Sequence, residues 1–470
     1  MFQNQTVDDE ARSIDGNNEM NAAARMIIDS ADDLAQRISD FGDAPPKYDR
    51  LFEGYARLAL QPGSAVLIFA PNSVEFLFHW IAALANGYVP CAIAPSTRTS
   101  LVSALQKSLN IAAIVGPRLD PARYQVKRFE RIGAFNVLVC DRTPPSYEPF
   151  DVLILTTGTS GSQTACVHTI ESLVCNASMT NKALNITAAD KQLVVLPMYH
   201  CYGLITQSIG AIISGCELKI DGPPFNANRF ADLIRKERIS ICGITPAIAR
   251  DLLRRGTVLP ALRSMSIGGD RVAPEEVMSL LSKSFINELY ITYGLTEAGP
   301  RVSVLPAHLA PVETYDSVGM PFNGISTRIE KPDAGGVGQL LVKTPSVCRR
   351  KVGVNILRQP FTSDGFLETG DLFTKDAAGY LRYVARKADI LIVQGEKLNT
   401  RSIDMVAESH PDVECARTAA GDMNSVVTRL WAKDDKVLDL EEIKKFMRSS
   451  LRLHEVPDKV IQERNAVFHK

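Results

Sequence analysis

The sequence predicts an α/β protein: a large N-terminal domain of mostly parallel sheets with flanking helices, followed by a small α+β domain. The first observation is that short apolar runs alternate with segments of helical periodicity over most of the chain, the pattern of βαβ units. The second is a change near Ala385, after which three apolar runs and two helical segments follow within a domain-sized stretch. We therefore expect an N-terminal tail and helix at 1–45, a large domain at 46–384 and a small domain at 385–470.

The N-terminal part of this pattern begins with a polar, acidic stretch at 1–20, which is expected to be a tail. Apolar residues at helical spacing follow at 21–41. A helix at 74–85 comes directly after a Pro-Asn-Ser turn, where Asn72 or Ser73 is expected to cap it. The other elements expected here are strands at 65–70, 88–94 and 112–115 and a helix at 100–109.

Apolar runs in the middle of the chain each end at a polar or glycine-containing loop. In a parallel sheet, ligands bind beyond the carboxyl ends of the strands, so these loops are expected to meet at one site. The expected strands are 152–155, 192–196, 239–244, 265–270 with its turn, and 288–292, together with a helix at 204–214. In the small domain we expect strands at 390–393, 414–419 and 426–431 and helices at 400–409 and 440–451.

The composition argues against several classes of function. The 52 Lys and Arg nearly balance the 53 Asp and Glu, so no basic excess favours binding to nucleic acid or to an anionic membrane. No apolar stretch approaches the roughly 20 residues that span a bilayer, and the first residues lack the features of a secretory signal. The nine cysteines are scattered, with no CxxC pair, which indicates free thiols in a reducing cytosol. We expect a cytoplasmic protein without a nucleic-acid or membrane partner.

The first stretch with chemical content is the loop after strand 152–155. Gly158 and Gly161 allow backbone conformations that other residues avoid. Hydroxyl side chains surround the two glycines: Thr156, Thr157, Thr159, Ser160 and Ser162. Backbone N–H groups and hydroxyls in such a loop make a good cradle for phosphate oxygens. The Walker spacing is absent, and about half of such Ser/Thr/Gly runs are plain surface turns.

Three further motifs follow in order: Tyr293-Gly294-Leu295-Thr296-Glu297, then Thr369-Gly370-Asp371, then Arg386-Lys387-Ala388-Asp389 before Gly395. Together with the loop, this order and spacing resembles the adenylate-forming superfamily. That superfamily comprises acyl- and aryl-CoA ligases, luciferases and the adenylation domains of nonribosomal peptide synthetases. The resemblance covers about Pro62 to Lys470. It implies a large domain that binds ATP and an acid, and a small mobile domain that turns between an adenylation pose and a thioester-forming pose.

The resemblance implies a role for each motif residue. The Thr296 hydroxyl would contact the nucleotide phosphates, and Glu297 would ligate Mg²⁺, which offsets the charge repulsion when a carboxylate attacks ATP. Tyr293 would stack on adenine, Asp371 would accept hydrogen bonds from the ribose hydroxyls, and Arg386 would lie near the ribose and the α-phosphate. Outside the motifs, a Thr-Glu pair or a Thr-Gly-Asp is usually a turn, a tyrosine is as often in the core, and an arginine is often an exposed charge. The full nucleotide-binding set is Thr156, Thr157, Gly158, Thr159, Ser160, Gly161, Gly268, Gly269, Asp270, Tyr293, Gly294, Asp371 and Arg386.

His200 closes the segment Leu196-Pro197-Met198-Tyr199-His200, which resembles a CoA-ligase segment whose histidine borders the substrate carboxylate. The alternative is a structural histidine at the end of a strand. Peptide-synthetase domains usually have Phe-Asp here, so an acid without an α-amino group is expected, and residues 293–300 favour an aryl acid. Gly268 and Gly269 match glycines that line the adenine and acyl pocket. Arg301 could pair with an acidic group of the substrate, but its expected place is the surface.

Four positions depart from the family pattern. Thr164 and Gln163 stand where the phosphate loop usually has lysine and proline, so a cation on the pyrophosphate side is missing. Ala388 replaces the usual polar hinge residue, and residues 401–404 replace an acidic Pro-x-Glu-x-Glu pattern. The closing motif is degenerate, with Lys470 near the position of the lysine that meets the substrate carboxylate during adenylation.

The main hypothesis is therefore an ATP- and Mg²⁺-dependent ligase that converts a carboxylic acid to an acyl-adenylate. The acyl group would then pass to a thiol, either of CoA or of the phosphopantetheine of an acyl carrier protein. The catalytic residues expected are Thr296, Glu297, His200 and Lys470. Two alternatives stay open: a degenerate member that is non-catalytic or handles a preformed acyl-adenylate, and an enzyme that adenylates another small oxyacid.

Overall fold

The structure, a computed structural model, describes residues 22–40, 48–124, 126–140, 144–156, 164–283, 286–354, 356, 358–393, 396–422, 425–433 and 436–463. By its internal contacts the chain divides into two compact units. Unit 1 contains Met1–Val302, Pro306–His308 and Thr344–Gln359, and unit 2 contains Ser303–Leu305, Leu309–Lys343 and Pro360–Lys470. The division predicted at 46 and 385 stays a prediction.

The first sheet of unit 1 has the strand order β18-β8-β7-β3-β2-β4-β6-β5. Its central strands β7, β3, β2 and β4 are parallel, and the flanking strands join antiparallel. The strands are β2 Ala65–Phe69, β3 Val89–Ile93, β4 Ile111–Gly116, β5 Arg128–Ile132, β6 Phe135–Val139, β7 Asp151–Thr156, β8 Thr164–Thr169 and β18 Arg350–Gly353.

Both faces of this sheet are covered, and this explains its unbroken apolar runs. Val66 and Ile68 on β2 belong to one core together with α4, whereas Leu67 belongs to a second core on the other face, with α5. Helix α4 spans Val74–Ala85, and its N-cap Ser73 accepts a hydrogen bond from the Phe76 backbone N–H at 3.0 Å. The predicted bounds of this helix and one of its two candidate caps are confirmed.

The second sheet of unit 1 is parallel in the order β1-β10-β9-β11-β12-β13. Its strands are β1 Ile38–Ser39, β9 Lys191–Val194, β10 Glu217–Ile220, β11 Ile241–Ile244, β12 Leu262–Gly268 and β13 Ile286–Gly294. Because these strands are parallel, the loops after β9, β11, β12 and β13 leave the sheet at one edge. Next in order comes β14 Arg301–Pro306, which is divided between the units and pairs antiparallel with β15 Met320–Pro321 in unit 2.

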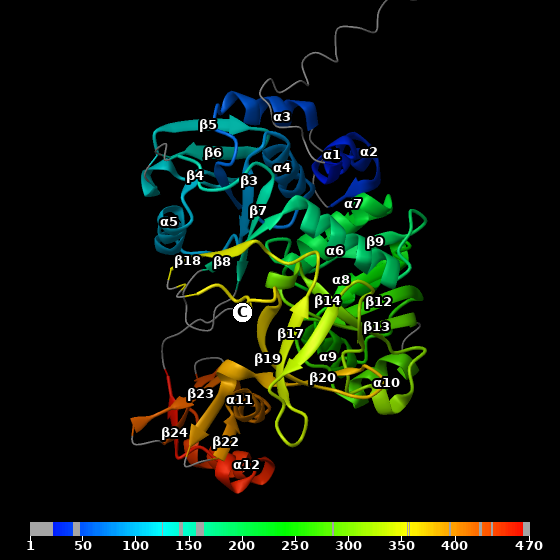
Figure 1. The fold of residues 1–470 in the computed structure, drawn as a ribbon, viewed down its shortest axis with the longest axis vertical. Coiled ribbons are helices and arrows are strands. Elements are labelled where there is room, and N and C mark those ends of the chain that lie inside the picture. Colours follow the sequence, from blue (N-terminus) through cyan, green and yellow to red (C-terminus); the bar gives the residue numbers. More distant parts are fainter. Residues whose placement is uncertain are drawn as a thin grey trace, which may run out of the picture. The chain divides into compact units, whose positions relative to one another are not determined.

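Helices of unit 1 connect the strands and fill the core. In Figure 1, α1, α4, α6 and α7 lie close to one another, and their buried residues belong to a single cluster. The largest fully buried side chains of that cluster include Trp80, Phe76 and Phe78 of α4. The helices are α1 Ala22–Asp29, α2 Ala31–Arg37, α3 Tyr48–Arg57, α4, α5 Thr99–Ser108, α6 Ile170–Ala183, α7 Gly210–Ser214, α8 Ala227–Lys236, α9 Pro246–Arg254 and α10 Pro274–Lys283.

Two predicted helices differ from the structure. The helix predicted at 21–41 is two helices, α1 and α2, that meet at Ser30, whose hydroxyl donates back to the Met26 carbonyl at 2.7 Å. A serine that bonds the preceding turn in this way competes with the regular helix. The helix predicted at 204–214 begins as a π-helix, η3 Tyr202–Ile209, and only then becomes α7. Helical turns with the wider π spacing occur often at functional sites.

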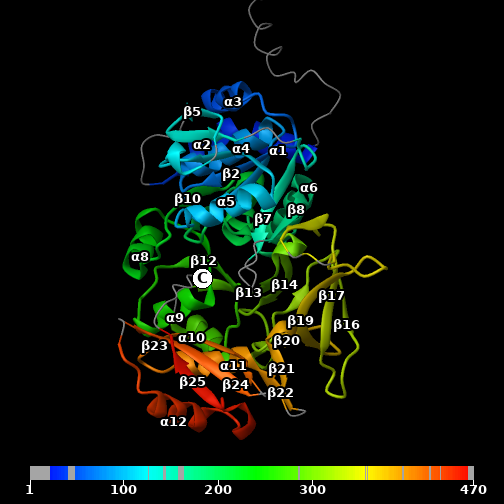
Figure 2. The same cartoon turned by 90° about the vertical axis from the view of Figure 1, so that its left-hand side faces the viewer.

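Unit 2 contains an antiparallel sheet in the order β16-β17-β19-β20 and a C-terminal α+β group. The sheet strands are β16 Ser326–Glu330, β17 Gly338–Lys343, β19 Leu367–Lys375 and β20 Leu381–Arg386. The C-terminal group has a core of its own, to which Ile403, Leu430 and Met447 belong, and Figure 2 shows its elements gathered together. Its elements are β21 Ile390–Val393, β22 Glu396–Asn399, α11 Thr400–Glu408, β23 Val413–Ala420, β24 Val426–Ala432, α12 Leu440–Ser450 and β25 Lys459–Gln462.

The predicted α/β class is confirmed, with one mostly parallel sheet and one mixed sheet in the N-terminal part, an antiparallel sheet in unit 2 and an α+β C-terminal group. All nine cysteines are free thiols. None of the helices in the described ranges has the length and apolar character needed to cross a bilayer.

Candidate active site

The motif at 293–297 forms a tight turn at the carboxyl end of β13. Tyr293 is buried in the strand, and a short 3-10 helix, η4 Thr296–Ala298, follows. The Leu295 N–H donates to the Pro300 carbonyl at 2.9 Å, which closes the turn. A Cβ on Gly294 would overlap that carbonyl oxygen, so the close approach requires glycine here.

The backbone of Thr296 and Glu297 is held from two neighbouring segments. His168 on β8 contacts the Thr296 carbonyl with its Nε2 at 2.9 Å. The Cys348 N–H donates to the Glu297 carbonyl, also at 2.9 Å. Burial lowers the pKa of His168 to about 4, although the Thr296 carbonyl and Glu297 act in the opposite direction. The ring is therefore neutral at neutral pH, and we assign its one proton to Nε2, which donates to Thr296.

Glu297 forms an ion pair with Lys351, a residue that the sequence analysis did not single out. The distance between Lys351 Nζ and Glu297 Oε1 is 2.7 Å, and the two side chains are 22% and 17% exposed. Burial disfavours the charge on Lys351, but Glu297 outweighs it and the pKa of the lysine is raised. The positive charge of Lys351 is thus secured beside Glu297.

The strand register explains how Lys351 reaches this place. On β18, Lys351 lies opposite Cys166 and Gly353 lies opposite Thr164. Side chains alternate across a strand, so Lys351 and Thr164 are on the same face of the sheet. The family pattern has a lysine at the position of Thr164. Lys351 on β18 therefore brings a cation close to the position of this missing lysine. In the sequence, Arg349, Arg350 and Lys351 form a short basic run without a motif, and the β8–β18 pairing identifies its third member.

Glu297 offers the hard carboxylate oxygen that Mg²⁺ prefers. The charged group already at 2.7 Å from Oε1 shows that a cation is electrostatically favourable beside this carboxylate. The residues present therefore fit a metal-assisted nucleotide site, and the role of Glu297 as its protein ligand stays a prediction.

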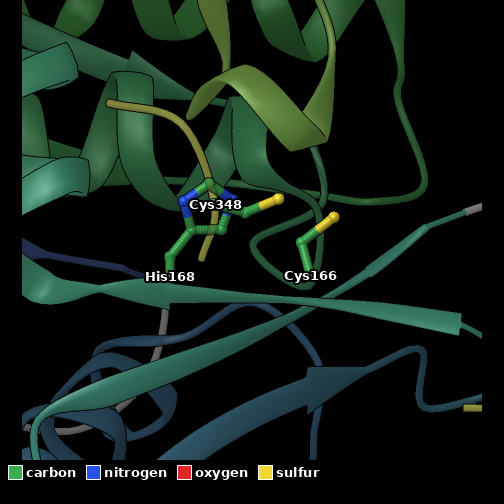
Figure 3. Close-up of side chains that lie close together, drawn as sticks. All are labelled: Cys166, His168 and Cys348. Atoms are coloured by element: carbon green, nitrogen blue, oxygen red, sulfur yellow. The ribbon is translucent and has the colours of Figure 1, made fainter. Parts of the chain in front are cut away.

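Cys166, His168 and Cys348 lie side by side behind this turn (Figure 3). Two of them come from β8, and the third points toward them from the segment before β18. They are a buried group that could hold a soft metal ion, because their donor atoms lie within 4.8 Å of one another. The contact with Cys348 and, after it, burial raise the pKa of the Cys166 thiol. Because His168 already bonds the Thr296 carbonyl through Nε2, we assign the group to packing behind the turn.

The phosphate loop is described only at its two ends. Thr156 and Thr164 are the last and first residues of β7 and β8, and their hydroxyl oxygens are 2.6 Å apart. The predicted phosphate-binding residues between them lie outside the described residues: Thr157, Gly158, Thr159, Ser160 and Gly161. The predicted Lys470 lies outside the described residues as well.

His200 lies in the turn after β9, next to the Thr296 turn. Its neighbour Cys201 has its sulfur 3.5 Å from the Thr296 hydroxyl. The His200 ring is half-buried, and burial lowers its pKa. The turns after two parallel strands therefore meet, as the sequence predicted.

The glycines after β12 leave space at the same edge. A Cβ on Gly268 would lie 2.5 Å from Arg301 Nη1, and a Cβ on Gly269 would have no atom within 4 Å. Asp270 is exposed, and its Oδ1 accepts from the Arg271 N–H at 2.8 Å. Gly268 is thus in contact with the Arg301 side chain, whereas Gly269 borders open space.

The surface position expected for Arg301 is wrong. Its exposed fraction is 3%, and its guanidinium carbon lies 3.8 Å from the centroid of the Tyr202 ring. The reason is that Arg301 begins β14, whose first three residues are buried.

Asp371 and Arg386 pair with each other in unit 2. They are opposite residues of β19 and β20, and Arg386 Nε donates to Asp371 Oδ1 at 2.9 Å. Asp371 is buried, and its N–H donates to the Thr369 hydroxyl at 3.1 Å. The roles of this pair toward the ribose stay predictions.

Comparison with known proteins gives a family and a fold. A family model described as AMP-binding enzyme matches residues 47–350. The chain is 24% identical over 319 residues to 2-succinylbenzoate–CoA ligase of Staphylococcus epidermidis. That alignment covers 67% of this chain and 66% of the relative, just under two thirds of its length. This chain is also 20% identical over 488 residues to the medium-chain acyl-CoA ligase ACSF2 of Rattus norvegicus. That alignment covers 90% of this chain and 79% of the relative.

The fold is similar to that of the o-succinylbenzoate CoA synthetase MenE from Bacillus subtilis in complex with its acyl-adenylate intermediate. The TM-score is 0.79 at 18% identity, and 94% of each chain is covered. The motif resemblance is thereby confirmed. With the match over most of its large N-terminal part, this chain belongs to the AMP-binding enzyme family.

Proposed function

We propose that this protein uses ATP to activate a carboxylic acid as an acyl-adenylate and then transfers the acyl group to a thiol. The observation that carries the proposal is the ion pair of Glu297 with Lys351 at the carboxyl edge of the parallel sheet, adjoining the Thr296 hydroxyl. Two relatives are named as CoA ligases, and one similar structure contains an acyl-adenylate, which supports the same reaction.

The first step joins two anions, so charge neutralisation and positioning are the main tasks of the site. The acid carboxylate attacks the α-phosphorus of ATP, a new O–P bond forms, and pyrophosphate leaves with the electron pair of the broken bond. Thr296 donates its hydroxyl to a phosphate oxygen, and His200 borders the acid at the adjacent turn. Mg²⁺ bound at Glu297 would neutralise phosphate charge.

Lys351 has a defined place in this mechanism. The phosphate loop carries Thr164 in place of the usual lysine, and Lys351 lies on the same face of the sheet, two residues along the pairing. We assign to Lys351 the task of holding Glu297 before the nucleotide binds and of supplying positive charge to the phosphates afterwards.

The second step breaks the acyl-adenylate at the carbonyl carbon. A thiolate attacks, a C–S bond forms and AMP leaves with the electron pair of the C–O bond. The thiol belongs to CoA or to a carrier-protein phosphopantetheine, and the relatives named as CoA ligases favour CoA. The acid lacks an α-amino group, and 2-succinylbenzoate is a first candidate because it is named for the relatives. The free thiols of the chain suit the reducing cytosol.

ATP–pyrophosphate exchange with labelled pyrophosphate, Mg²⁺ and a panel of aryl, alkyl and amino acids tests the first step. We expect exchange with at least one acid lacking an α-amino group, and loss of exchange in Glu297→Ala. ATP binding without exchange for any acid would contradict acid activation and favour a degenerate member or an adenylating enzyme for another oxyacid. Exchange at the wild-type rate in Glu297→Ala would contradict the metal assignment.

A further inference from the structure

Arg301 is a buried cation whose backbone is fixed in place. Its N–H donates to Asn176 Oδ1 at 2.9 Å, and its carbonyl accepts from Asn176 Nδ2, also at 2.9 Å. Asn176 is itself fully buried on α6 and also donates to the Ser346 hydroxyl at 3.0 Å. The start of β14 is therefore anchored, and so is the base of the Arg301 side chain.

The guanidinium group has hydrogen-bond donors that the chain does not use. Within the described ranges, Nε and Nη2 of Arg301 are buried and have no hydrogen-bond partner. Stacking on Tyr202, whose hydroxyl contacts Ser266 Oγ at 3.0 Å, compensates only part of the cost of burying a charge. Because arginine does not deprotonate in proteins, its unpaired donors are available to the acceptors of a bound molecule.

The surroundings of the guanidinium point to an anion in the acid pocket. A side chain at Gly268 would collide with Nη1, and the space beside Gly269 is open. Both glycines match positions that line the acyl pocket. The carboxylate of Glu297, which lies near Cys201 as Arg301 does, is already paired with Lys351 at 2.7 Å. The positive charge of Arg301 is thus left for a ligand.

We propose that Arg301 binds a second acidic group of the substrate. The acids that this chain activates then carry a further carboxylate, or a comparable anion, besides the carboxylate that receives AMP. A planar guanidinium with two unpaired N–H groups suits a carboxylate, which it can bind through both oxygens. The inference rests on the proposed function and specifies its substrate class.

The test compares acids that differ only by the second carboxylate. Suitable pairs are 2-succinylbenzoate against 4-oxo-4-phenylbutanoate, and hexanedioate against hexanoate, each measured by ATP–pyrophosphate exchange. We expect kcat/KM to be about 10- to 100-fold higher for the preferred diacid than for its monoacid partner, the range of a charged hydrogen-bonded contact. The ratio needs only the wild-type protein, so it stands even where a variant fails to fold.

Variants then assign the preference to Arg301. Arg301→Met should bring the ratio within a pair close to one, and Arg301→Lys should keep part of it. Arg118→Met, which removes an exposed arginine of unit 1, should leave the ratio unchanged. Equal kcat/KM for both members of every pair in the wild type would overturn the inference while the adenylation reaction stands. A ratio that is unchanged in folded Arg301→Met would also overturn the inference. An equal loss of kcat/KM for monoacids and diacids in that variant would show that Arg301 has only a packing role. Absence of exchange with any acid would instead contradict the proposed function.

Discussion

The ion pair of Lys351 with Glu297 lies where the proposed reaction needs positive charge. Replacing the lysine by methionine keeps the length of the side chain but removes its charge. We expect Lys351→Met to lower the ATP–pyrophosphate exchange rate by roughly 10- to 100-fold, because one charge-assisted contact is lost. The exchange rate of the variant should also depend more steeply on the Mg²⁺ concentration than that of the wild type.

A second substitution separates a local electrostatic role from damage to the fold. Because Thr164 and Lys351 share one face of the sheet, Thr164→Lys in the Lys351→Met background should restore part of the rate. Arg350→Met is the matched control, since Arg350 is the next residue on β18, points to the other face and donates to the Ser146 carbonyl. Wild-type exchange in Lys351→Met would show that the pair is not used.

His168 gives the stability of the protein a predictable pH dependence. Its pKa is about 4 in the folded protein, below the ordinary value of 6.5, so between these values the unfolded chain binds a proton that the folded chain does not. The contribution of His168 to the free energy of unfolding is therefore fully present above pH 6.5. It is lost as the pH falls toward 4, and the loss is about 3 kcal/mol in total. Urea unfolding between pH 4 and 7 should show it.

His168→Gln tests the assignment, because an amide N–H can still donate to Thr296 but does not titrate. In this range, the slope of the free energy of unfolding against pH should be smaller in the variant by up to the equivalent of one proton. The substitution should change the free energy of unfolding less at pH 7 than at pH 4.5. The comparison with the wild type is needed because burial lowers the pKa of His79 as well. An unchanged slope would contradict the assignment.

At the level of helices and strands, local pattern predicted the elements that local chemistry decides. Helix α4 matches its predicted bounds of 74–85 because Ser73 caps it and its residues are apolar on nearly all sides. The pairing of β8 with β18 was not predicted, because its partners are more than 180 residues apart and no local signal encodes the register. The same pairing determines the position of Lys351. The role of Lys351 and the β8–β18 pairing were therefore missed for the same reason. Arg301 was misplaced because a charged residue after a turn is typical of a surface, whereas the anchoring by Asn176 is purely tertiary.

The π-helix η3 depends on a glycine, and this leads to a prediction about the acid-binding turn. A Cβ on Gly203 would collide with the Pro197 carbonyl, which lies in the same turn as His200. Gly203→Ala should therefore displace this turn and lower kcat/KM for the acid by about 10- to 100-fold, since small misplacements at a reacting centre are costly. ATP binding, measured by calorimetry, should change little.

The control for this substitution is Gly335→Ala, where the nearest atom to the new Cβ is Asp333 Oδ1 at an ordinary 3.4 Å. It should leave both exchange and ATP binding intact. An equal loss of ATP affinity in Gly203→Ala would mean that the turn supports the nucleotide site rather than the acid.

On the scale of the whole chain, the two proposed half-reactions make different demands on its parts. The Thr296, Glu297 and Lys351 cluster belongs to unit 1, whereas the C-terminal group of unit 2 has a core of its own, as expected for a separately folded part. The motif order predicted the reaction class that we propose, because each motif is short and local in sequence. The boundary at 385 rests on the change of sequence pattern and the turning of the small domain on the family resemblance, and both stay predictions.

Lys470 allows the two half-reactions to be separated by experiment. The family resemblance gives it a role in adenylation alone, so Lys470→Met should lower ATP–pyrophosphate exchange by about 10- to 100-fold through loss of one charged contact. Thioester formation from a chemically prepared acyl-adenylate and CoA should continue at the wild-type rate. Lys459→Met, at an exposed position on β25, should change neither reaction. If both half-reactions fell together in Lys470→Met, the lysine would serve the C-terminal domain as a whole. If neither fell, the degenerate closing motif would have lost this role, and another cation, with Lys351 as the first candidate, would meet the charge that develops during adenylation.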